Sequence, residues 1–135
     1  MAATPLNSIL FICRHNSVRS QLAALLTEKI SHSAVKAACA GPEPTAVPDF
    51  IQNWAEQLGH SSPLTSQPLE QVSDQSFDMV VTLCDKSHQA LPKIENDSQH
   101  IRWDFHHADT ADQLKHLEIE LAERIRLLLL TKGVI

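Results

Sequence analysis

One cysteine, Cys13, stands at the end of an apolar run and is followed six residues later by Arg19 and then by Ser20. The apolar residues 9–12 predict a short buried strand, and apolar residues recur at helical spacing between 22 and 30. A loop that runs from a strand into a helix N-terminus directs several backbone N–H groups into one concavity, where the helix dipole also attracts an anion. The spacing therefore places a thiol and a guanidinium at the mouth of an anion site.

The residue types in this loop predict a nucleophile beside an oxyanion cradle. An anion site favours the thiolate form of Cys13, because the thiolate is itself an anion. Arg19 offers a planar fork of donors for two oxygens of a tetrahedral oxyanion, and Ser20 can donate its hydroxyl to the thiolate. Asn16 tolerates the left-handed backbone that a tight loop without glycine needs. The alternative is that Cys13 is a small buried hydrophobic residue. That interpretation does not explain why Arg, Ser and Asn occupy the loop positions that an anion site would use.

Length and composition indicate one globular domain spanning residues 1–135. A net charge of −5 argues against a nucleic-acid partner, and no apolar run approaches the length of a membrane span. The first residues lack the basic and apolar segments of a secretion signal. Three widely spaced cysteines, Cys13, Cys39 and Cys84, do not suggest a secreted disulfide framework. We expect a cytoplasmic enzyme without nucleic-acid or membrane partners.

The elements that must position this loop alternate between strands and helices. The predicted strands and helices are, in order, 9–12, 22–30, 35–41, 47–58, one turn near Leu69, 77–84, a short helix ending before Pro92, 99–105, and a long helix from Thr110 to Lys132–Gly133. This order predicts a three-layer α/β/α domain with a four-stranded parallel sheet. Ligands bind at the carboxyl ends of parallel strands, so Cys13 and Cys84 should lie at the same edge of the sheet.

A cysteine, five residues, an arginine and a serine after the first strand resemble the signature loop of the low-molecular-weight protein tyrosine phosphatases. The arsenate reductases built on the same fold share this loop. The string from Cys13 to Ala23 is more similar to the reductases, whose loops often carry a His-Asn pair and an Arg-Ser-Gln-x-Ala continuation. The resemblance implies a sheet in the order 2-1-3-4. It also implies that the oxyanion is bound by Arg14, His15, Asn16, Ser17, Val18 and Arg19.

The string Val-Thr-Leu-Cys at residues 81–84 is similar to a string of the arsenate reductases in which the cysteine is the second redox thiol. The resemblance thus implies that Cys84 is a resolving thiol, although a core residue at the strand end is an equally open interpretation. Many of those reductases place a third cysteine just before a proline. Leu91 precedes Pro92 here, so a relay through three cysteines is not available. Cys39 is interpreted as a buried strand residue without a role.

The segment after the fourth strand is similar to the general-acid loop of the family. Trp103, Asp104 and Phe105 fit the family string, but the position of the acid then falls on His107, with no proline after it. The candidates for the acid are therefore Asp104, His107 and Asp109, since a histidine donates a proton near neutral pH. No metal site is expected from the His-His pair.

The leading hypothesis is an arsenate reductase of arsenic detoxification. Cys13 attacks arsenate, Cys84 then attacks Cys13 and releases arsenite, and thioredoxin or glutaredoxin with glutathione restores the thiols. No bound cofactor is expected. The first alternative is a phosphatase acting on phosphotyrosine or another phosphorylated residue through phosphocysteine. The second is a degenerate oxyanion-binding regulatory module.

Overall fold

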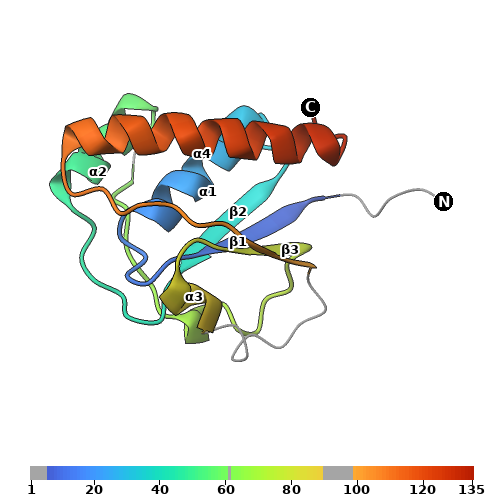
Figure 1. Cartoon of the computed structure of the whole chain (residues 1–135), viewed down its shortest axis with the longest axis horizontal. Helices are drawn as coiled ribbons and strands as arrows, with labels where there is room; N and C mark the ends of the chain where they lie inside the picture. The colour runs from blue at the N-terminus through green and yellow to red at the C-terminus, as the bar shows by residue number, and fades with distance from the viewer. Residues whose placement is uncertain (1–5, 61, 90–98) are drawn as a thin grey trace.

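A computed structural model describes residues 6–60, 62–89 and 99–135 of the chain. Helices and strands alternate along these residues (Figure 1). The elements are β1 (Ser8–Ile12), α1 (Arg19–Ile30), β2 (Lys36–Ala40), α2 (Asp49–Gln57), the 3-10 turn η1 (Leu69–Gln71), β3 (Met79–Thr82), α3 (Asp85–Gln89), β4 (Gln99–Arg102) and α4 (Ala111–Thr131). The turn predicted near Leu69 is present, whereas Leu91 and Pro92 lie outside the described residues.

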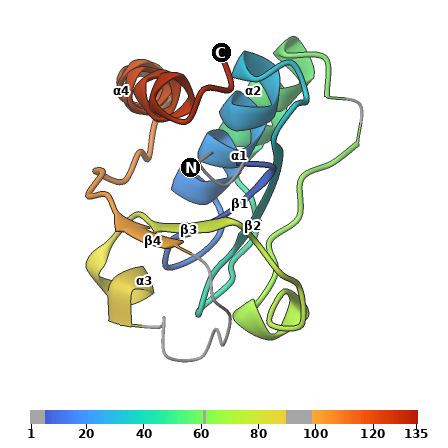
Figure 2. The same ribbon diagram turned by 90° about the vertical axis from the view of Figure 1, so that its right-hand side faces the viewer.

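The four strands form one parallel sheet in the order β2-β1-β3-β4, as predicted. The helices α1, α2 and α4 cover one face of the sheet, and α3 and η1 lie on the other face (Figures 1 and 2). The predicted three-layer α/β/α architecture is therefore confirmed. Among the described residues, no helix has the length and apolarity that a membrane span needs.

Two apolar clusters sandwich the central strand β1, because its side chains alternate between the faces of the sheet. Ile9 and Phe11 belong to the larger cluster beneath α1, α2 and α4. Leu10 and Ile12 belong to the smaller cluster on the side of η1. All four side chains are fully buried, and each contributes about 1.5–3 kcal/mol by leaving water. This packing fixes the end of β1, where the polar loop begins.

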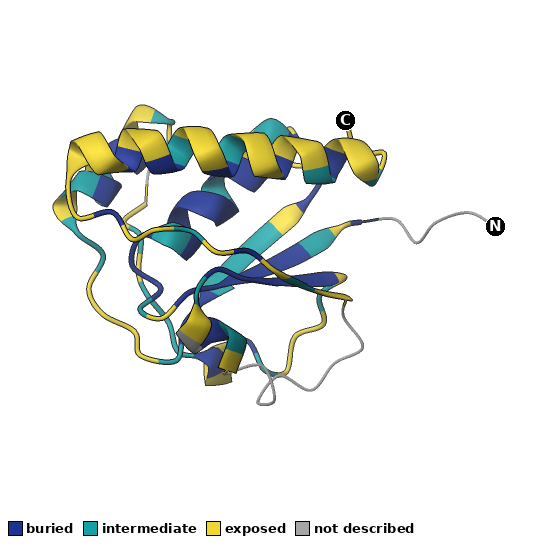
Figure 3. Ribbon diagram, viewed as in Figure 1, coloured by how far each residue is buried: buried dark blue, intermediate teal, exposed yellow. Residues whose placement is uncertain are grey.

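The long helix α4 packs through a stripe at helical spacing and leaves its outer face in water (Figure 3). The helix begins where the sequence predicted, and Thr110 caps it, since its hydroxyl accepts from the N–H of Gln113 at 3.2 Å. Near its end Leu129 is fully buried in the core, whereas Leu128 is only partly buried. The charged residues mostly face solvent as expected, except that Arg124 lies over the ring of Trp103 at 5.6 Å.

Strand β3 is shorter than the sequence predicted, because it ends at Thr82 and not at Cys84. The hydroxyl of Ser87 accepts from the N–H groups of Leu83 and Cys84 at 3.1 and 3.0 Å. It thereby turns the chain out of the sheet and into α3. Apolar burial continues through Leu83, so a hydrophobic pattern does not reveal this turn. Cys84 consequently lies in the turn that precedes α3, beyond the strand.

Candidate active site

The thiol of Cys13 lies at the floor of the loop between β1 and α1. Cys13 is 2% exposed, and its Sγ donates to the Oγ of Ser20 at 3.1 Å. The same hydroxyl accepts from the Nδ2 of Asn16 at 2.7 Å. Because α1 begins at Arg19, its free N-terminal N–H groups point to the loop. The structure thus brings together Cys13, Asn16, Arg19 and Ser20.

Asn16 organises the backbone of this loop. Its φ of 50° lies in the left-handed region, as its residue type predicted. Its Oδ1 accepts from the N–H of Gln67 at 2.8 Å, and its carbonyl accepts from the side chain of Gln21 at 3.0 Å. Sequence reasoning assigned no role to Gln21 or Gln67. Gln67 stands in a polar segment without periodicity, so no local signal could have identified it.

Gly41 closes the loop from behind, immediately after β2. A Cβ atom at this position would lie 2.5 Å from the carbonyl oxygen of Cys13, 2.8 Å from that of Arg14 and 2.9 Å from the backbone nitrogen of Asn16. Only a residue without a side chain allows this approach. The glycine predicted to end the second strand therefore sets the shape of the loop.

Two sets of donors in the loop lack acceptors within the described part of the chain. The backbone N–H groups of residues 15–20 donate to no backbone carbonyl there. The Nε of Arg19 is buried without a hydrogen-bond partner, while its Nη1 donates to the carbonyl of Phe105 at 3.1 Å. A buried cationic N–H needs an acceptor. The missing acceptor fits an oxyanion bound at the helix N-terminus.

The side chains of Arg14 and His15 point to the rim of the loop. Arg14 pairs with the Glu43 carboxylate at 3.2 Å, an exposed contact worth less than about 1 kcal/mol. The Nδ1 of His15 lies 2.9 Å from the carbonyl of Glu43. The resemblance assigned both residues to oxyanion binding, but their side chains contact Glu43 instead, and of the two only His15 has a backbone N–H without a described acceptor.

Cys84 lies half-buried against the same loop. Burial raises the pKa of the Cys84 thiol, but several donors outweigh it and leave the pKa below its usual value. The opposing contributions come from the hydroxyl and N–H of Ser87, the charge of Arg19 and the N–H of Arg14. Arg14 is the residue next to Cys13, so the second thiol is close to the loop that holds the first. All three cysteines are free thiols.

Cys39 differs from the other two thiols. It lies in β2, one strand away from Cys13, and burial raises the pKa of its thiol to about 11 even though the side chain of Asn16 lowers it. A thiol with this pKa is almost entirely protonated near neutral pH and is a poor nucleophile. Its position in β2 agrees with its interpretation as a strand residue.

The three candidate acids follow β4. The Nε2 of His107 and the Oδ1 of Asp109 form a pair at 2.9 Å. Asp104 has an 81% exposed side chain, and its Oδ1 accepts from the Nε2 of His88 at 3.1 Å. Asp104 therefore contacts α3 through a hydrogen bond, whereas His107 and Asp109 form a pair with each other.

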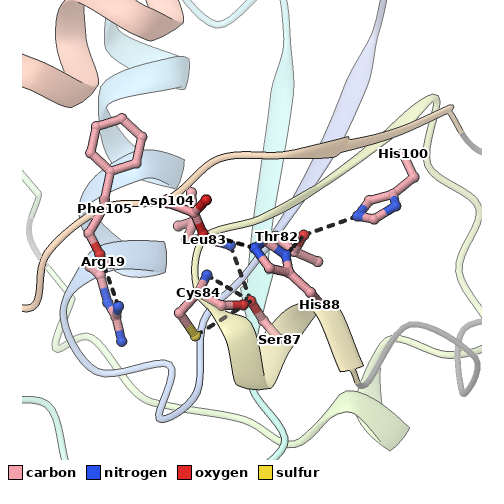
Figure 4. Close-up of polar contacts among 9 residues, drawn as sticks. All are labelled: Arg19, Thr82, Leu83, Cys84, Ser87, His88, His100, Asp104 and Phe105. Carbon is pink, nitrogen blue, oxygen red and sulfur yellow. Dashed lines mark hydrogen bonds and ion pairs between the residues drawn. The ribbon is translucent and has the colours of Figure 1, made fainter.

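His88 lies in a hydrogen-bonded row that sequence reasoning missed (Figure 4). Its Nδ1 contacts the hydroxyl of Thr82, and that hydroxyl lies 2.9 Å from the Nε2 of His100. Ligand atoms of Asp85, His88 and Asp104 lie within 4.8 Å of one another, which a metal ion could use. Both ring nitrogens of His88 are already occupied by Thr82 and Asp104, so the row is complete without an ion.

Comparisons with known proteins agree with this geometry. The profile of the family described as low molecular weight phosphotyrosine protein phosphatase matches residues 8–121. The glutaredoxin arsenate reductase of Synechocystis sp. PCC 6803 is 28% identical over 80 residues, which are 58% of this chain and 61% of that protein.

Solved structures extend the similarity over the whole fold. The thioredoxin-dependent arsenate reductase Cg_ArsC1' of Corynebacterium glutamicum has a TM-score of 0.76 and 25% identity, over 98% of this chain and 64% of that one. A low molecular weight protein tyrosine phosphatase of Bacillus subtilis has a TM-score of 0.73 and shares the fold at 19% identity, over 90% and 93% of the two chains. The match spans less than two thirds of each of the two reductases.

Proposed function

The chain belongs to the low molecular weight phosphotyrosine protein phosphatase family, a family of enzymes, and within it we propose that this chain is an arsenate reductase with Cys13 as its nucleophile. The observation that carries the proposal is the position of Cys84, whose thiol is influenced by the Arg14 N–H and by Arg19. Hydrolysis through a phosphocysteine needs one thiol at the site. Reduction of an oxyanion needs two electrons, which two neighbouring thiols supply.

In the first step the oxyanion binds the loop and reacts with Cys13. Arsenate oxygens accept from the backbone N–H groups of residues 15–20 and from the Nε of Arg19, the donors that lack acceptors within the described residues. The Cys13 thiolate attacks arsenic, a sulfur–arsenic bond forms, and one arsenate oxygen leaves as water after protonation. Ser20 holds the sulfur in place, since its hydroxyl contacts Sγ at 3.1 Å.

In the second step Cys84 resolves the adduct. Its thiolate attacks the Sγ of Cys13, a disulfide forms, and the sulfur–arsenic bond breaks with its electron pair passing to arsenic. Arsenic(V) becomes arsenic(III) and leaves as arsenite, while the two thiols lose two electrons. An external dithiol of the thioredoxin type, or glutaredoxin with glutathione, then reduces the Cys13–Cys84 disulfide.

The alternative, a phosphatase activity, is favoured by the His107–Asp109 pair beyond β4. A histidine paired with a carboxylate can protonate a leaving alkoxide, and phosphocysteine on Cys13 would then be hydrolysed by water. The same loop would bind the phosphate group. The two activities differ in whether Cys84 takes part.

The deciding experiment compares Cys84→Ser with Cys39→Ser as a matched control. We expect arsenate to induce a Cys13–Cys84 disulfide in the reduced protein, which thiol trapping and peptide mass spectrometry detect. Steady-state arsenate reduction should be lost in Cys84→Ser and retained in Cys39→Ser. If Cys84→Ser reduces arsenate at the wild-type rate, Cys84 is not the resolving thiol. Hydrolysis of an aryl phosphate without arsenate reduction would establish the phosphatase alternative.

A further inference from the structure

The described part of the helix that follows Cys84 is too short to be stable without tertiary contacts. It spans five residues, Asp85–Gln89, and isolated helices of that length are unstable in water. Its first turn is closed locally, since the hydroxyl of Ser87 donates to the Cys84 carbonyl at 2.7 Å and the N–H of His88 donates to the same carbonyl at 3.0 Å. These bonds lie within one segment. Leu83 attaches the start of the turn to the sheet, because its N–H donates to the Ile12 carbonyl at 2.9 Å, but these bonds leave the rest of α3 without a tie to a strand.

The side chain of His88 supplies the attachment. It is only 5% exposed, and its two ring nitrogens reach the end of β3 and the segment after β4 (Figure 4). The Nδ1 contacts the hydroxyl of Thr82 at the end of β3, and the Nε2 contacts the Oδ1 of Asp104 after β4 at 3.1 Å. Within the described part of α3, no other side chain forms a hydrogen bond with a strand residue.

The Asp104 contact also connects α3 with the support of Arg19. Asp104 precedes Phe105, whose N–H donates to the Leu83 carbonyl at 3.3 Å and whose carbonyl accepts from Arg19 at 3.1 Å. The segment that bears the second thiol and the segment that holds the oxyanion-binding guanidinium therefore meet at His88.

We propose that His88 is a positioning residue that, by tying α3 to Thr82 and Asp104, holds the Cys84 thiol beside the Arg14 N–H and the Arg19 guanidinium. This inference rests on the proposed function, in which the thiolate of Cys84 attacks Cys13. A thiol held next to these donors is kept in the attacking form and in reach of its target. When the tie is absent, the turn of α3 loosens and the thiol loses its donors.

The test measures the thiol itself, without arsenate. Iodoacetamide alkylation of Cys84 is followed against pH by peptide mass spectrometry in a Cys13→Ser background. Cys39 is resolved as a separate peptide and, with a pKa of about 11, reacts slowly. We expect His88→Ala to move the midpoint of the Cys84 profile upward by about one pH unit, a tenfold drop in thiolate at neutral pH. The midpoint reports the donors around the sulfur, whereas simple exposure changes the plateau rate.

Three variants separate positioning from general damage. His88→Gln keeps a donor toward Asp104 and should restore part of the shift. His100→Ala is the matched control, because His100 contacts the same Thr82 hydroxyl but forms no hydrogen bond with the described part of α3, and the Cys84 midpoint in this variant should equal that of the parent. In the otherwise wild-type chain, His88→Ala should still bind inorganic phosphate, which shows that the Cys13 loop is folded.

The outcomes distinguish this inference from the proposed function. An unchanged midpoint in both His88→Ala and His88→Gln, with phosphate binding intact, overturns the positioning role. A shifted midpoint in a protein whose Cys84→Ser variant still reduces arsenate at the wild-type rate supports the role of His88 and refutes the resolving role of Cys84. A shift in His100→Ala as large as that in His88→Ala also overturns the inference, because it makes the effect independent of α3.

Discussion

Replacing Gly41 by alanine tests whether the approach of β2 shapes the oxyanion loop. The added Cβ atom would lie 2.5 Å from the carbonyl oxygen of Cys13, and the ordinary contact distance begins at 3.4 Å. The loop must therefore retreat by about 0.9 Å, the difference between these distances. All three nearest atoms belong to backbone, so no flexible side chain can move aside instead.

The displacement predicts two magnitudes. Overpacking of this kind costs about 1–3 kcal/mol in the free energy of unfolding. For a chain of this length the midpoint of thermal unfolding then falls by roughly 4–11 °C. A shift of about 1 Å between a nucleophile and its oxyanion donors lowers kcat/KM by about a hundredfold. Activity should thus be largely lost at temperatures where the protein is still folded.

The control for this variant is Gly59→Ala. Gly59 has a φ of +90° and no atom within 4 Å of an added Cβ, so alanine there introduces backbone strain of about 1–2 kcal/mol without a collision. Both variants are compared at 20 °C, where both remain folded, by circular dichroism and by arsenate turnover. Gly59→Ala should lose stability and keep its activity. If Gly41→Ala turns over within twofold of the wild type, the proposed bracing of the loop is refuted.

Three further outcomes follow from the site. Cys13→Ser should abolish arsenate reduction and aryl-phosphate hydrolysis while the urea unfolding midpoint stays near that of the wild type; residual turnover in purified protein would contradict its role as nucleophile. If phosphatase activity is present, His107→Gln or Asp109→Asn should lower hydrolysis of a poor-leaving-group ester by about 100-fold, and full activity in both would exclude this pair as the acid. Burial, and then neighbouring basic side chains, hold the pKa of His100 below 6.5. The unfolded state therefore binds the proton more readily, so the contribution of His100 to stability is present above pH 6.5 and is lost as the pH falls through the folded pKa. Urea unfolding at pH 7.5 and 5 should show a smaller pH dependence in His100→Gln, and an equal dependence would refute this assignment.

The fold and the floor of the site follow from patterns that are local in the sequence. The loop from Cys13 to Ser20 is contiguous, so its residue types reveal its chemistry before any tertiary contact is known. The left-handed Asn16 and the cap at Thr110 are also properties of single positions. The parallel order of the sheet follows from the alternation of strands and helices together with the family resemblance.

The parts that sequence reasoning missed depend on contacts between distant segments. Gln67 reaches Asn16 from a segment without periodicity. His88 connects the end of β3 with the segment after β4, although in the sequence it looks like an ordinary polar helix residue. The turn after β3 involves the hydroxyl of Ser87, which accepts from the N–H groups of Leu83 and Cys84. Neither hydrophobic spacing nor propensity records such bonds.

Trp103, over whose ring Arg124 stacks, can report the occupancy of the oxyanion loop through its fluorescence. Trp103 is 5% exposed and precedes by two residues the carbonyl of Phe105 that holds Arg19. The second tryptophan of the chain, Trp54, instead donates its indole N–H to Glu118 under α4. Indole emission responds to nearby charge. An anion that binds Arg19 therefore alters the surroundings of Trp103 but not those of Trp54. A chain with Trp54→Phe retains Trp103 as its single indole, and the occupancy of the loop can then be followed in real time without a label.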